Sequence, residues 1–254
     1  MGRSEALTGD RVGPLLRGRF GAPYLWSEEC RSTQDVLLQN EWDEGAISVT
    51  EHQTGGRGRQ RRAWTDTSGR SLLLSLLLRP QVGAPVEQLS LLVGLAVAES
   101  IDAVAGTRSE LKWPNDVLVA GRKVAGILLE SSGGTVVCGV GINVNQTEDE
   151  LPTDTRVPAG SLQLVTGREH DRASLLATLL LALEQRYDTW RENGLERFAV
   201  ELERRDALRG RRVSVGDLSG TAAGIAGDGR LRVASDDGTE SLVASGEVHE
   251  HVDD

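Results

Sequence analysis

A chain of 254 residues with a net charge of −10 is long enough for one large domain, or for a main domain with a small companion, and either can bury its own core. Its composition, 39% hydrophobic and 26% charged, is ordinary for a globular protein, and no run approaches the roughly 18 apolar residues that a membrane span needs. The negative charge argues against a surface that embraces nucleic acid, because phosphate binding needs a broad basic face. Any anion site must therefore be local.

The N-terminus and the cysteines indicate the compartment. The N-terminus has no apolar signal-peptide core, so we expect a cytoplasmic protein without a membrane anchor. Cys30 and Cys138 are far apart and outside any Cys-x-x-Cys pattern, which argues against a disulfide framework or a cysteine zinc site. We expect both to be small buried hydrophobic residues. Lysines are scarce, and the only two, Lys112 and Lys123, are candidates for chemistry for that reason.

In chain order, the first 145 residues alternate between strand and helix patterns. The hydroxyls of Ser32 and Thr33 are placed to cap a short helix that runs to residue 38. The nearly all-apolar run 71–78 is typical of a strand buried on both faces, and the apolar spacing over 86–104 predicts a long core helix. A two-residue hairpin turn is expected at Gly121-Arg122. Further strands are expected at 46–52, 110–113, 117–120, 123–129 and 135–144. These elements predict a mixed α+β core.

The second half of the chain contains two more helices and a region of short strands. Residues 146–170 are expected to form a loop with a short turn, followed by helices at 171–192 and at about 195–207. From Gly210 onward, short alternating runs between glycines predict a small five-stranded barrel of about 45 residues. We therefore divide the chain into a main domain, residues 1–208, and a C-terminal barrel domain, residues 209–254.

A glycine- and arginine-rich loop between two expected strands is the first sign of chemistry. Four arginines and three glycines lie within the eight positions from Gly55 to Arg62, with no acid among them. Such a loop repels itself unless an anion binds, so we expect residues 54–62 to be poorly ordered when empty and ordered around phosphate. A solvated basic loop or a nucleic-acid contact is the alternative. The position between two buried strands favours a ligand.

Three later segments are able to complete a nucleotide site, although no Walker A or dinucleotide-binding glycine pattern is present. The segment from Lys112 to Asp116 combines a cation, a tryptophan that can stack a base, and an amide beside a carboxylate that can hold Mg²⁺. Lys123 begins an apolar strand, where its ammonium must enter a cleft or reach solvent. The run from Gly139 to Asn145 allows close backbone approach, or forms a strand with a bulge.

These four segments, in this order, resemble the biotin protein ligase family over roughly residues 31–145. Gly-Arg-Gly-Arg, Lys-Trp-Pro-Asn-Asp, Arg-Lys-Val-Ala-Gly-Ile-Leu and Gly-x-Gly-Ile-Asn-x-Asn are signatures of that family. The C-terminal barrel is similar in kind to the family's SH3-like domain. The resemblance implies a class II synthetase-like α+β fold, with a mixed sheet and packed helices forming a catalytic domain.

The activity that the resemblance implies has two steps. The enzyme would form biotinyl-5′-AMP from biotin and ATP with the help of Mg²⁺, and would then transfer biotin to a lysine of a biotin carboxyl carrier protein. Biotin's own carboxylate would attack the α-phosphate, so two anions must be brought together by cations. From the net charge and the lack of a long apolar run we expect no DNA or membrane partner, and we expect a monomer or homodimer.

The resemblance also assigns roles to residues. Lys123 and Arg59 would be catalytic, with Lys123 between the biotin carboxylate and the α-phosphate, and Asp116 would hold the metal. The biotin subsite would consist of Ser32, Thr33, Gln34, Gln53, Arg57, Gly58, Arg59, Lys123 and Gly126. The nucleotide subsite would consist of Arg59, Arg62, Trp64, Asn115, Asp116, Lys123 and Asn143.

Two positions depart from the family pattern. Arg61 stands where the family loop commonly has a second glycine, which would stiffen the loop and change how fast it closes. Gln34 replaces a frequent asparagine with a longer amide that can still reach the biotin ring. Neither change removes a charge that the chemistry needs.

Three alternative functions remain open at this stage. Lipoate or octanoate transferases share the α+β core but usually lack the arginine-glycine loop. A DNA-binding regulator would need an N-terminal winged helix, yet only about 30 residues precede Arg31, and Pro14, Gly18 and Gly21 interrupt them. A C-terminal interaction module would assist a ligase and not replace it. We expect deletion of residues 1–30 to spare catalysis.

Overall fold

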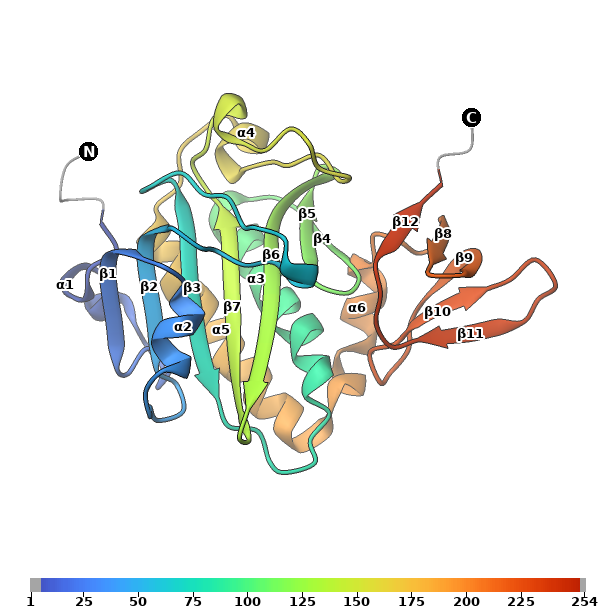
Figure 1. Ribbon diagram of the computed structural model, residues 1–254, viewed down its shortest axis with the longest axis horizontal. Coiled ribbons are helices and arrows are strands. Elements are labelled where there is room, and N and C mark those ends of the chain that lie inside the picture. The colour runs from blue at the N-terminus through green and yellow to red at the C-terminus, as the bar shows by residue number, and fades with distance from the viewer. Residues whose placement is uncertain (1–5, 252–254) are drawn as a thin grey trace.

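Seven strands form the central sheet of the computed structural model, which describes residues 6–251 (Figure 1). Their order is β1-β2-β3-β7-β6-β5-β4, in which β1 and β2 run parallel and the other neighbouring pairs are antiparallel. This mixed sheet confirms the expected α+β core. The strands are β1 (Tyr24–Cys30), β2 (Ile47–Gln53), β3 (Ser71–Leu78), β4 (Ser109–Lys112), β5 (Asp116–Val119), β6 (Arg122–Ser132) and β7 (Thr135–Asn143).

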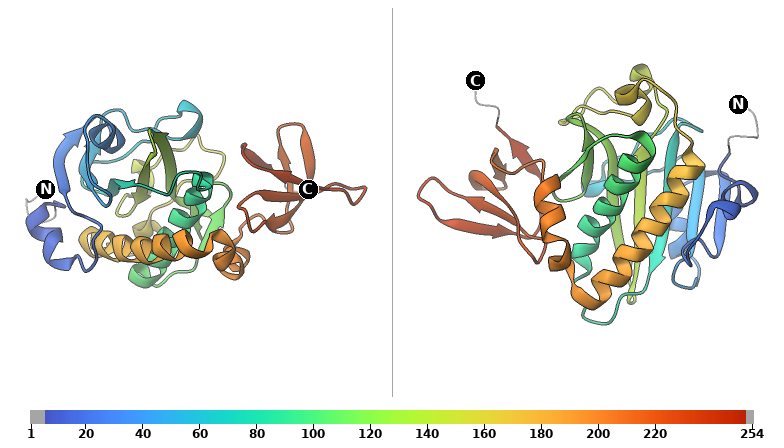
Figure 2. Two further views of the ribbon diagram at one scale, coloured as in Figure 1. Left: turned by 90° about the horizontal axis from the view of Figure 1, so that it is seen from below. Right: turned by 180° about the vertical axis from the view of Figure 1, so that it is seen from behind.

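Two long helices cover one face of this sheet. α3 (Leu89–Ala105) and α5 (Arg172–Asn193) lie side by side against it and pack on each other (Figure 2, right). Residues 86–105 are long and apolar enough to cross a membrane, but 72% of the most apolar window is buried inside the protein. A helix covered on all sides is apolar on all sides, so its place in the core accounts for this composition.

β3 is covered on both faces, as its apolar sequence predicts. Leu72 and Leu74 belong to the large core that the sheet shares with α3 and α5. Leu77, on the opposite face, packs with Leu37 of α2 (Thr33–Leu38). Burying each such side chain contributes roughly 1.5–3 kcal/mol, so β3 fixes the middle of the sheet. Beside α2, the same face of β6 and β7 lines an open cleft.

The N-terminal segment is part of the core, which argues against the expectation that deletion of residues 1–30 spares catalysis. β1 adds an edge strand parallel to β2 (Figure 1). Leu7 and Phe20 are at most 2% exposed, and the N–H of Leu7 donates to the buried carboxylate of Glu51 at 2.7 Å. The sequence hid β1 because its burial does not alternate. Residues 1–5, which that truncation includes, lie outside the described residues.

A five-stranded antiparallel sheet forms the C-terminal part, as predicted, with the order β11-β10-β9-β8-β12 (Figure 1). It follows α6 (Ala199–Arg205), and the expected domain division at 208/209 falls in the connection between that helix and β8. Residues 252–254 of the expected domain lie outside the described part of the chain. The strands are β8 (Arg212–Val215), β9 (Leu218–Ile225), β10 (Leu231–Ala234), β11 (Glu240–Val243) and β12 (Val248–Glu250).

Hydrogen bonds join this sheet to the main domain at the β9–β10 turn. Trp113 is 2% exposed, and its indole N–H donates to the carbonyl of Gly229 at 3.0 Å. Gln88 donates to the carbonyl of Asp228 at 3.3 Å and accepts from the indole N–H of Trp190 at 2.8 Å. Trp113 is therefore an anchor between the two domains, and it has no open face on which a base can stack, contrary to the sequence-based expectation.

The turn between β5 and β6 lies one residue earlier than predicted. Ala120 and Gly121 have φ angles of 50° and 72°, and Arg122 already pairs with Val119. A type I′ hairpin requires two consecutive left-handed residues, so the turn is Ala120-Gly121. The expected turn at Gly121-Arg122 is therefore wrong by one position.

Residues 146–170 contain more structure than the expected loop with a short turn. α4 (Leu162–Thr166) begins at Ser161, whose hydroxyl accepts the N–H of Leu164 at 3.0 Å. The expected helix at 195–207 begins as a 3-10 turn and becomes α6. The remaining helical elements are α1 (Gly9–Val12) and the 3-10 turns Gly13–Leu15, Arg59–Arg61, Val86–Gln88, Glu148–Glu150 and Leu195–Phe198.

Candidate active site

An open cleft of about 1120 Å³ lies on the face of the central sheet that carries α2. Its floor is formed by β6 and β7, and its walls by α2, the basic loop, the connection 152–159 and strand β12 of the C-terminal sheet. Pockets for one small ligand hold roughly 300–1,000 Å³, so this cleft has room for two small molecules at once. Every residue that the sequence analysis placed in the site lines it.

The inner end of the cleft is polar and well ordered by hydrogen bonds. Gln53, the last residue of β2, accepts from the backbone N–H of Thr33 at 2.9 Å and from its hydroxyl at 3.3 Å. The Thr33 hydroxyl also lies 2.7 Å from Ser75 Oγ. Ser32 occupies the N-cap position of α2, but no side-chain capping bond forms, so the expected cap by these hydroxyls is wrong. The Ser32 hydroxyl is left to the cleft.

Gln34 reaches across the floor of the cleft. Its side chain is 3% exposed, and its Nε2 donates to the carbonyl of Leu128 on β6 at 3.2 Å. A Cβ on Gly139 of β7 would lie 2.9 Å from the Gln34 side-chain carbonyl carbon, so only glycine fits beneath this amide. The longer amide noted in the sequence therefore has its own space in the sheet.

The basic loop is an irregular hairpin. The N–H of Trp64 donates to the carbonyl of Gly56 at 3.0 Å, and Arg57 and Ala63 form an antiparallel bridge. Nearer the tip, the N–H of Gly58 donates to the backbone carbonyl of Arg62 at 2.7 Å. The loop backbone therefore has partners of its own, which glycine and arginine composition alone did not reveal.

The tip of this hairpin holds two residues in a left-handed conformation. Gln60 and Arg61 have φ angles of 56° and 61°. A left-handed backbone costs a non-glycine residue roughly 1–2 kcal/mol, whereas glycine adopts it freely. The glycine that the family commonly has at the position of Arg61 is thus the residue that this backbone favours.

Two of the loop arginines pair with carboxylates from distant segments. Arg57 lies 2.7 Å from Asp35 Oδ1 and 2.9 Å from Glu130 Oε2, and Arg62 pairs with Glu247. The expectation that the loop carries four uncompensated charges is therefore wrong. Poor order of residues 54–62 in the free enzyme stays a prediction. Charge repulsion no longer supports it at these two arginines.

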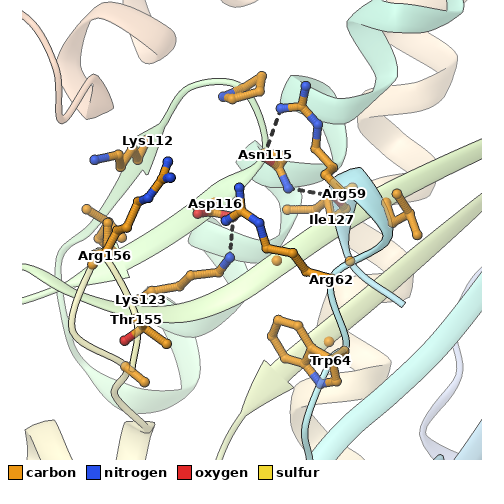
Figure 3. Close-up of a pocket in the computed structure, with 18 of the residues that line it drawn as sticks. Arg59, Arg62, Trp64, Lys112, Asn115, Asp116, Lys123, Ile127, Thr155 and Arg156 are labelled. Carbon is orange, nitrogen blue, oxygen red and sulfur yellow. Dashed lines mark hydrogen bonds and ion pairs between the residues drawn. The ribbon is translucent and has the colours of Figure 1, made fainter. Parts of the chain in front are cut away.

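Arg59 is the loop arginine with a free charge in the cleft. Its guanidinium donates to Asn115 Oδ1 at 3.3 Å (Figure 3) and forms no ion pair among residues 6–251. Burial lowers the pKa of Arg59, and the nearby carboxylates of Asp116 and Glu247 offset only part of this effect. A partly buried guanidinium without a carboxylate gains strongly from an incoming anion.

Trp64 lies over a glycine floor. Gly126 and Gly141 face each other across β6 and β7. A Cβ would lie 2.9 Å from the Trp64 ring at Gly126 and 2.5 Å from it at Gly141, so neither position accepts a side chain while the ring lies there. Lys123 Nζ is 5.9 Å from the centroid of the same ring. The two strand glycines thus bring the indole, the lysine and the sheet together.

A lysine and a carboxylate meet in the middle of the cleft. Lys123, near the start of β6, places Nζ 2.7 Å from Oδ1 of Asp116, the first residue of β5 (Figure 3). Asn115, in the turn before Asp116, donates to the carbonyl of Ile127 at 2.9 Å. The strand register fixes all three groups, because β5 and β6 are adjacent.

Asn143 has a different situation from the other candidates. It is 6% exposed, donates to the carbonyl of Gly160 at 2.9 Å and accepts from Gln146 at 3.1 Å. Both of its polar atoms are therefore in use, and they attach the end of β7 to the connection before α4. To bind a nucleotide directly, Asn143 must give up one of these hydrogen bonds. Otherwise it acts only by holding the connection before α4.

The sequence analysis missed the charged outer end of the cleft. Lys112 pairs with Glu250, and Arg156 lies 2.7 Å from Glu247, which also pairs with Arg62. Burial raises the pKa of Glu247, but the two arginines outweigh it and leave that pKa below its usual range. Lys112 had been singled out as a scarce lysine and as the cation of the segment from Lys112 to Asp116. Glu247, just before β12, and Glu250, at its end, gave no local signal.

The carboxylates present fit a metal ion that arrives with a substrate. Among residues 6–251, no group of three or more His, Cys, Asp or Glu side chains is placed to hold a metal by itself. Asp116 Oδ1 is buried, and apart from the ion pair with Lys123 it has no hydrogen-bond donor. Mg²⁺ commonly takes one or two carboxylates together with substrate phosphates, which Asp116 can provide.

Comparison with known proteins places this cleft in a known context. The Biotin/lipoate A/B protein ligase family matches residues 26–146, and the Biotin protein ligase C terminal domain matches residues 210–249. The first match contains the whole floor and loop of the cleft, and the second contains β8 to β11 and all of β12 except Glu250.

Two curated proteins are similar over most of their length. The "Bifunctional ligase/repressor BirA" of Bacillus spizizenii is 33% identical over 241 residues, covering 89% of this chain and 74% of that protein. The "Biotin--[acetyl-CoA-carboxylase] ligase" of Mycobacterium tuberculosis is 40% identical over 199 residues, covering 74% and 73%. Among solved structures, the biotin protein ligase of Aquifex aeolicus in complex with biotin and ATP superposes with a TM-score of 0.82 at 31% identity, covering 89% of this chain and 97% of that one.

Proposed function

This chain belongs to the biotin/lipoate A/B protein ligase family, and from that premise we propose how its cleft divides between two substrates. The protein is an ATP-dependent ligase that forms biotinyl-5′-AMP from biotin and ATP and transfers biotin to a lysine of a biotin carboxyl carrier protein. The observation that carries the proposed division is the position of Lys123 and Asp116 between a polar inner pocket and a basic outer end.

We assign biotin to the inner end. Ser32, Thr33, Gln34 and Gln53 present hydroxyls and amides there, which suit the ureido group of biotin because each can donate or accept. Arg57, Gly58, Arg59 and Gly126 close the pocket toward the middle of the cleft. The fixed orientation of Gln53 and Thr33 supports this assignment, since a recognition site needs donors and acceptors that do not rotate freely.

We assign ATP to the outer end. The nucleotide residues proposed from sequence, Arg59, Arg62, Trp64, Asn115, Asp116, Lys123 and Asn143, all line the cleft, which supports this assignment. Asp116 would hold Mg²⁺ together with the phosphates of the nucleotide, and the metal would supply charge neutralisation there. Lys112 and Arg156, which the sequence had not assigned, add two more cations to the same end. A nucleotide that binds there competes with Glu247 and Glu250 for these cations.

The chemistry needs cations and not a protein nucleophile. The biotin carboxylate is itself the nucleophile toward the α-phosphate, and pyrophosphate leaves. Lys123 and Arg59 lie where the two anions meet, so they offset the repulsion and stabilise the charge of the transition state. The loop then covers the adenylate and keeps out water until the acceptor lysine attacks its acyl carbon and releases AMP.

We also propose the setting in which the enzyme works. We propose a cytoplasmic location, a monomer or homodimer, and a division into domains at 208/209, the last of which the separate C-terminal sheet supports. Some relatives carry the name ligase/repressor. For this chain we propose that DNA is not a partner, which its net charge of −10 supports, because phosphate binding needs a broad basic face.

Calorimetric titration with biotin, followed by ATP, tests the proposed function. Biotin should bind alone, and ATP should bind more tightly once biotin is present, because the two anions share Lys123 and Arg59. Lipoate, the substrate type of the other branch of the family, should compete weakly at most. Binding of lipoate in preference to biotin would assign the chain to that other branch.

A further inference from the structure

The basic loop closes at its base through a buried carboxylate that the sequence motifs do not include. Asp66 lies just after the loop, two residues beyond Trp64, and its side chain is fully buried. Its Oδ2 accepts the backbone N–H of Gln53 at 3.2 Å, and its Oδ1 lies 2.8 Å from Nδ1 of His52. The two ends of the loop therefore meet at one side chain.

This carboxylate replaces a missing strand contact. The pairing of β2 with β3 runs from Ile47 opposite Leu76 to Thr50 opposite Leu73, and it stops there. The N–H of Gln53 lies beyond that register, so Asp66 and not β3 accepts it. A buried backbone donor without an acceptor is costly, so Asp66 helps to hold the end of β2, together with β1, which pairs with β2 as far as Gln53.

The position of Gln53 matters because its side chain organises the inner end of the cleft. Gln53 Oε1 accepts from both the backbone and the hydroxyl of Thr33, the first residue of α2. A shift of the Gln53 backbone moves this amide and loosens the Thr33 hydroxyl. No comparable link runs from Asp66 to Lys112 or Arg156 at the outer end of the cleft.

We propose that Asp66 is a positioning residue for biotin: by joining the base of the loop to β2, it holds Gln53 and Thr33 in their binding geometry. This inference rests on the assignment of biotin to the inner end of the cleft. Asp66 does not touch the substrate in this arrangement. It acts through Gln53, so its effect falls on biotin and on retention of the adenylate, and not on ATP.

The experiment compares Asp66→Ala, Asp66→Asn and a matched control, Asp102→Ala. Asp102 also accepts a backbone N–H, that of Ser109 at 2.7 Å, but it lies on α3 and does not line the cleft. For each protein, the Kd for biotin, the KM for ATP, the release rate of biotinyl-5′-AMP and the melting temperature are measured. Comparison of Asp66→Ala with Asp102→Ala separates loss of stability from loss of biotin binding.

We expect Asp66→Ala to raise the Kd for biotin about tenfold, the upper range for loss of one hydrogen bond, with the KM for ATP within about twofold of wild type. Asp66→Asn keeps an oxygen that can accept the Gln53 N–H, so its Kd should rise only about threefold. Asp102→Ala should lower the melting temperature and leave both substrate constants unchanged. Adenylate release should follow the order of the biotin Kd values.

Three results would overturn the proposal: an unchanged biotin Kd in folded Asp66→Ala, an equal rise in the ATP and biotin constants, or a biotin defect in Asp102→Ala of the same size. If the alanine variant does not fold, an unchanged biotin Kd in Asp66→Asn overturns it instead. Failure of the wild-type protein to bind biotin is a different outcome, because that result removes the proposed function itself.

Discussion

The ammonium of Lys123 lies 2.7 Å from the carboxylate of Asp116 across neighbouring strands. Both side chains are reachable from the cleft, with exposures of 32% and 18%. In the proposed site, Lys123 attracts the substrate anions and Asp116 attracts Mg²⁺. On binding of the nucleotide, Lys123 would turn from Asp116 to the substrate anions, and Asp116 would be free to hold Mg²⁺, which would supply charge neutralisation. The pair keeps both groups in place while the cleft is empty.

Lys123→Ala is expected to lower the rate of adenylate formation by a factor on the order of 10²–10³, or ~3 kcal/mol, by analogy with removal of one oxyanion donor. The fold should persist, because the Lys123 ammonium is partly exposed and packs little. Lys123→Arg should also fall short of the wild-type rate, since a planar guanidinium does not replace a compact ammonium between two anions. Pyrophosphate release in single turnover measures the effect. Near-normal rates in both variants would remove Lys123 from the chemistry.

Arg59→Gly is expected to weaken retention of biotinyl-5′-AMP more than its synthesis. Arg59 lines the cleft and has no carboxylate partner among the described residues, whereas Lys123 and Arg62 remain to assist the first step. Activated biotin should then leak and label bystander lysines. Adenylate release and nonspecific biotinylation are compared with wild type, alongside hydrogen exchange of residues 54–62 with and without ligands. Equal release rates, with a loop already protected in the free enzyme, would contradict this role.

Trp113→Phe is expected to loosen the contact between the domains. The change leaves the carbonyl of Gly229 without its indole donor, which should cost about 1–3 kcal/mol of stability. Because the C-terminal sheet brings Glu247 and Glu250 to the outer end of the cleft, the KM for ATP should change while the Kd for biotin does not. The matched control is Trp26→Phe, since Trp26 also donates its indole N–H, to Glu51 at 3.3 Å, but lies on β1. Equal effects of both variants on ATP would argue against the anchor.

Arg61→Gly is expected to stabilise the protein by about 0.5–1 kcal/mol, because glycine adopts the left-handed backbone at this position without steric cost. Thermal melting with and without biotin and ATP measures the gain. Val82→Gly is the control, since Val82 is a fully exposed loop residue outside the left-handed region. That variant should be neutral or destabilising. A loss of stability in Arg61→Gly equal to that of the control would show that the tip carries no strain.

Deleting residues 1–30 is expected to destabilise the protein severely, because it removes β1 and buried side chains that include Leu7 and Phe20. Leu7→Ala should cause a smaller loss, about 2–5 kcal/mol, as truncation of a buried leucine does in other cores. Circular dichroism melting of both variants gives the comparison. A truncated protein that melts like wild type would mean that the central sheet does not need its edge strand.

The chain itself determines the type and order of most elements. The apolar run of β3, the spacing of α3 and the glycines of β6 and β7 are local patterns, and they depend on neighbours only a few residues away. The same is true of the motifs that point to the cleft. All of the candidate residues named from sequence line one cavity, but it is the fold that brings their separate segments together there.

Only the tertiary structure decides which charges meet. Arg62 and Glu247 are separated by 185 positions, and Arg57 pairs with carboxylates on α2 and β6, so no local pattern reveals that two of the four loop arginines are paired. Trp113 is equally ambiguous from sequence, since an indole can stack a base or anchor a domain until the fold places Gly229 beside it. Periodicity and turn chemistry act along the chain, whereas ion pairs and domain contacts act through space. The fold therefore determines how the candidate residues are held in place.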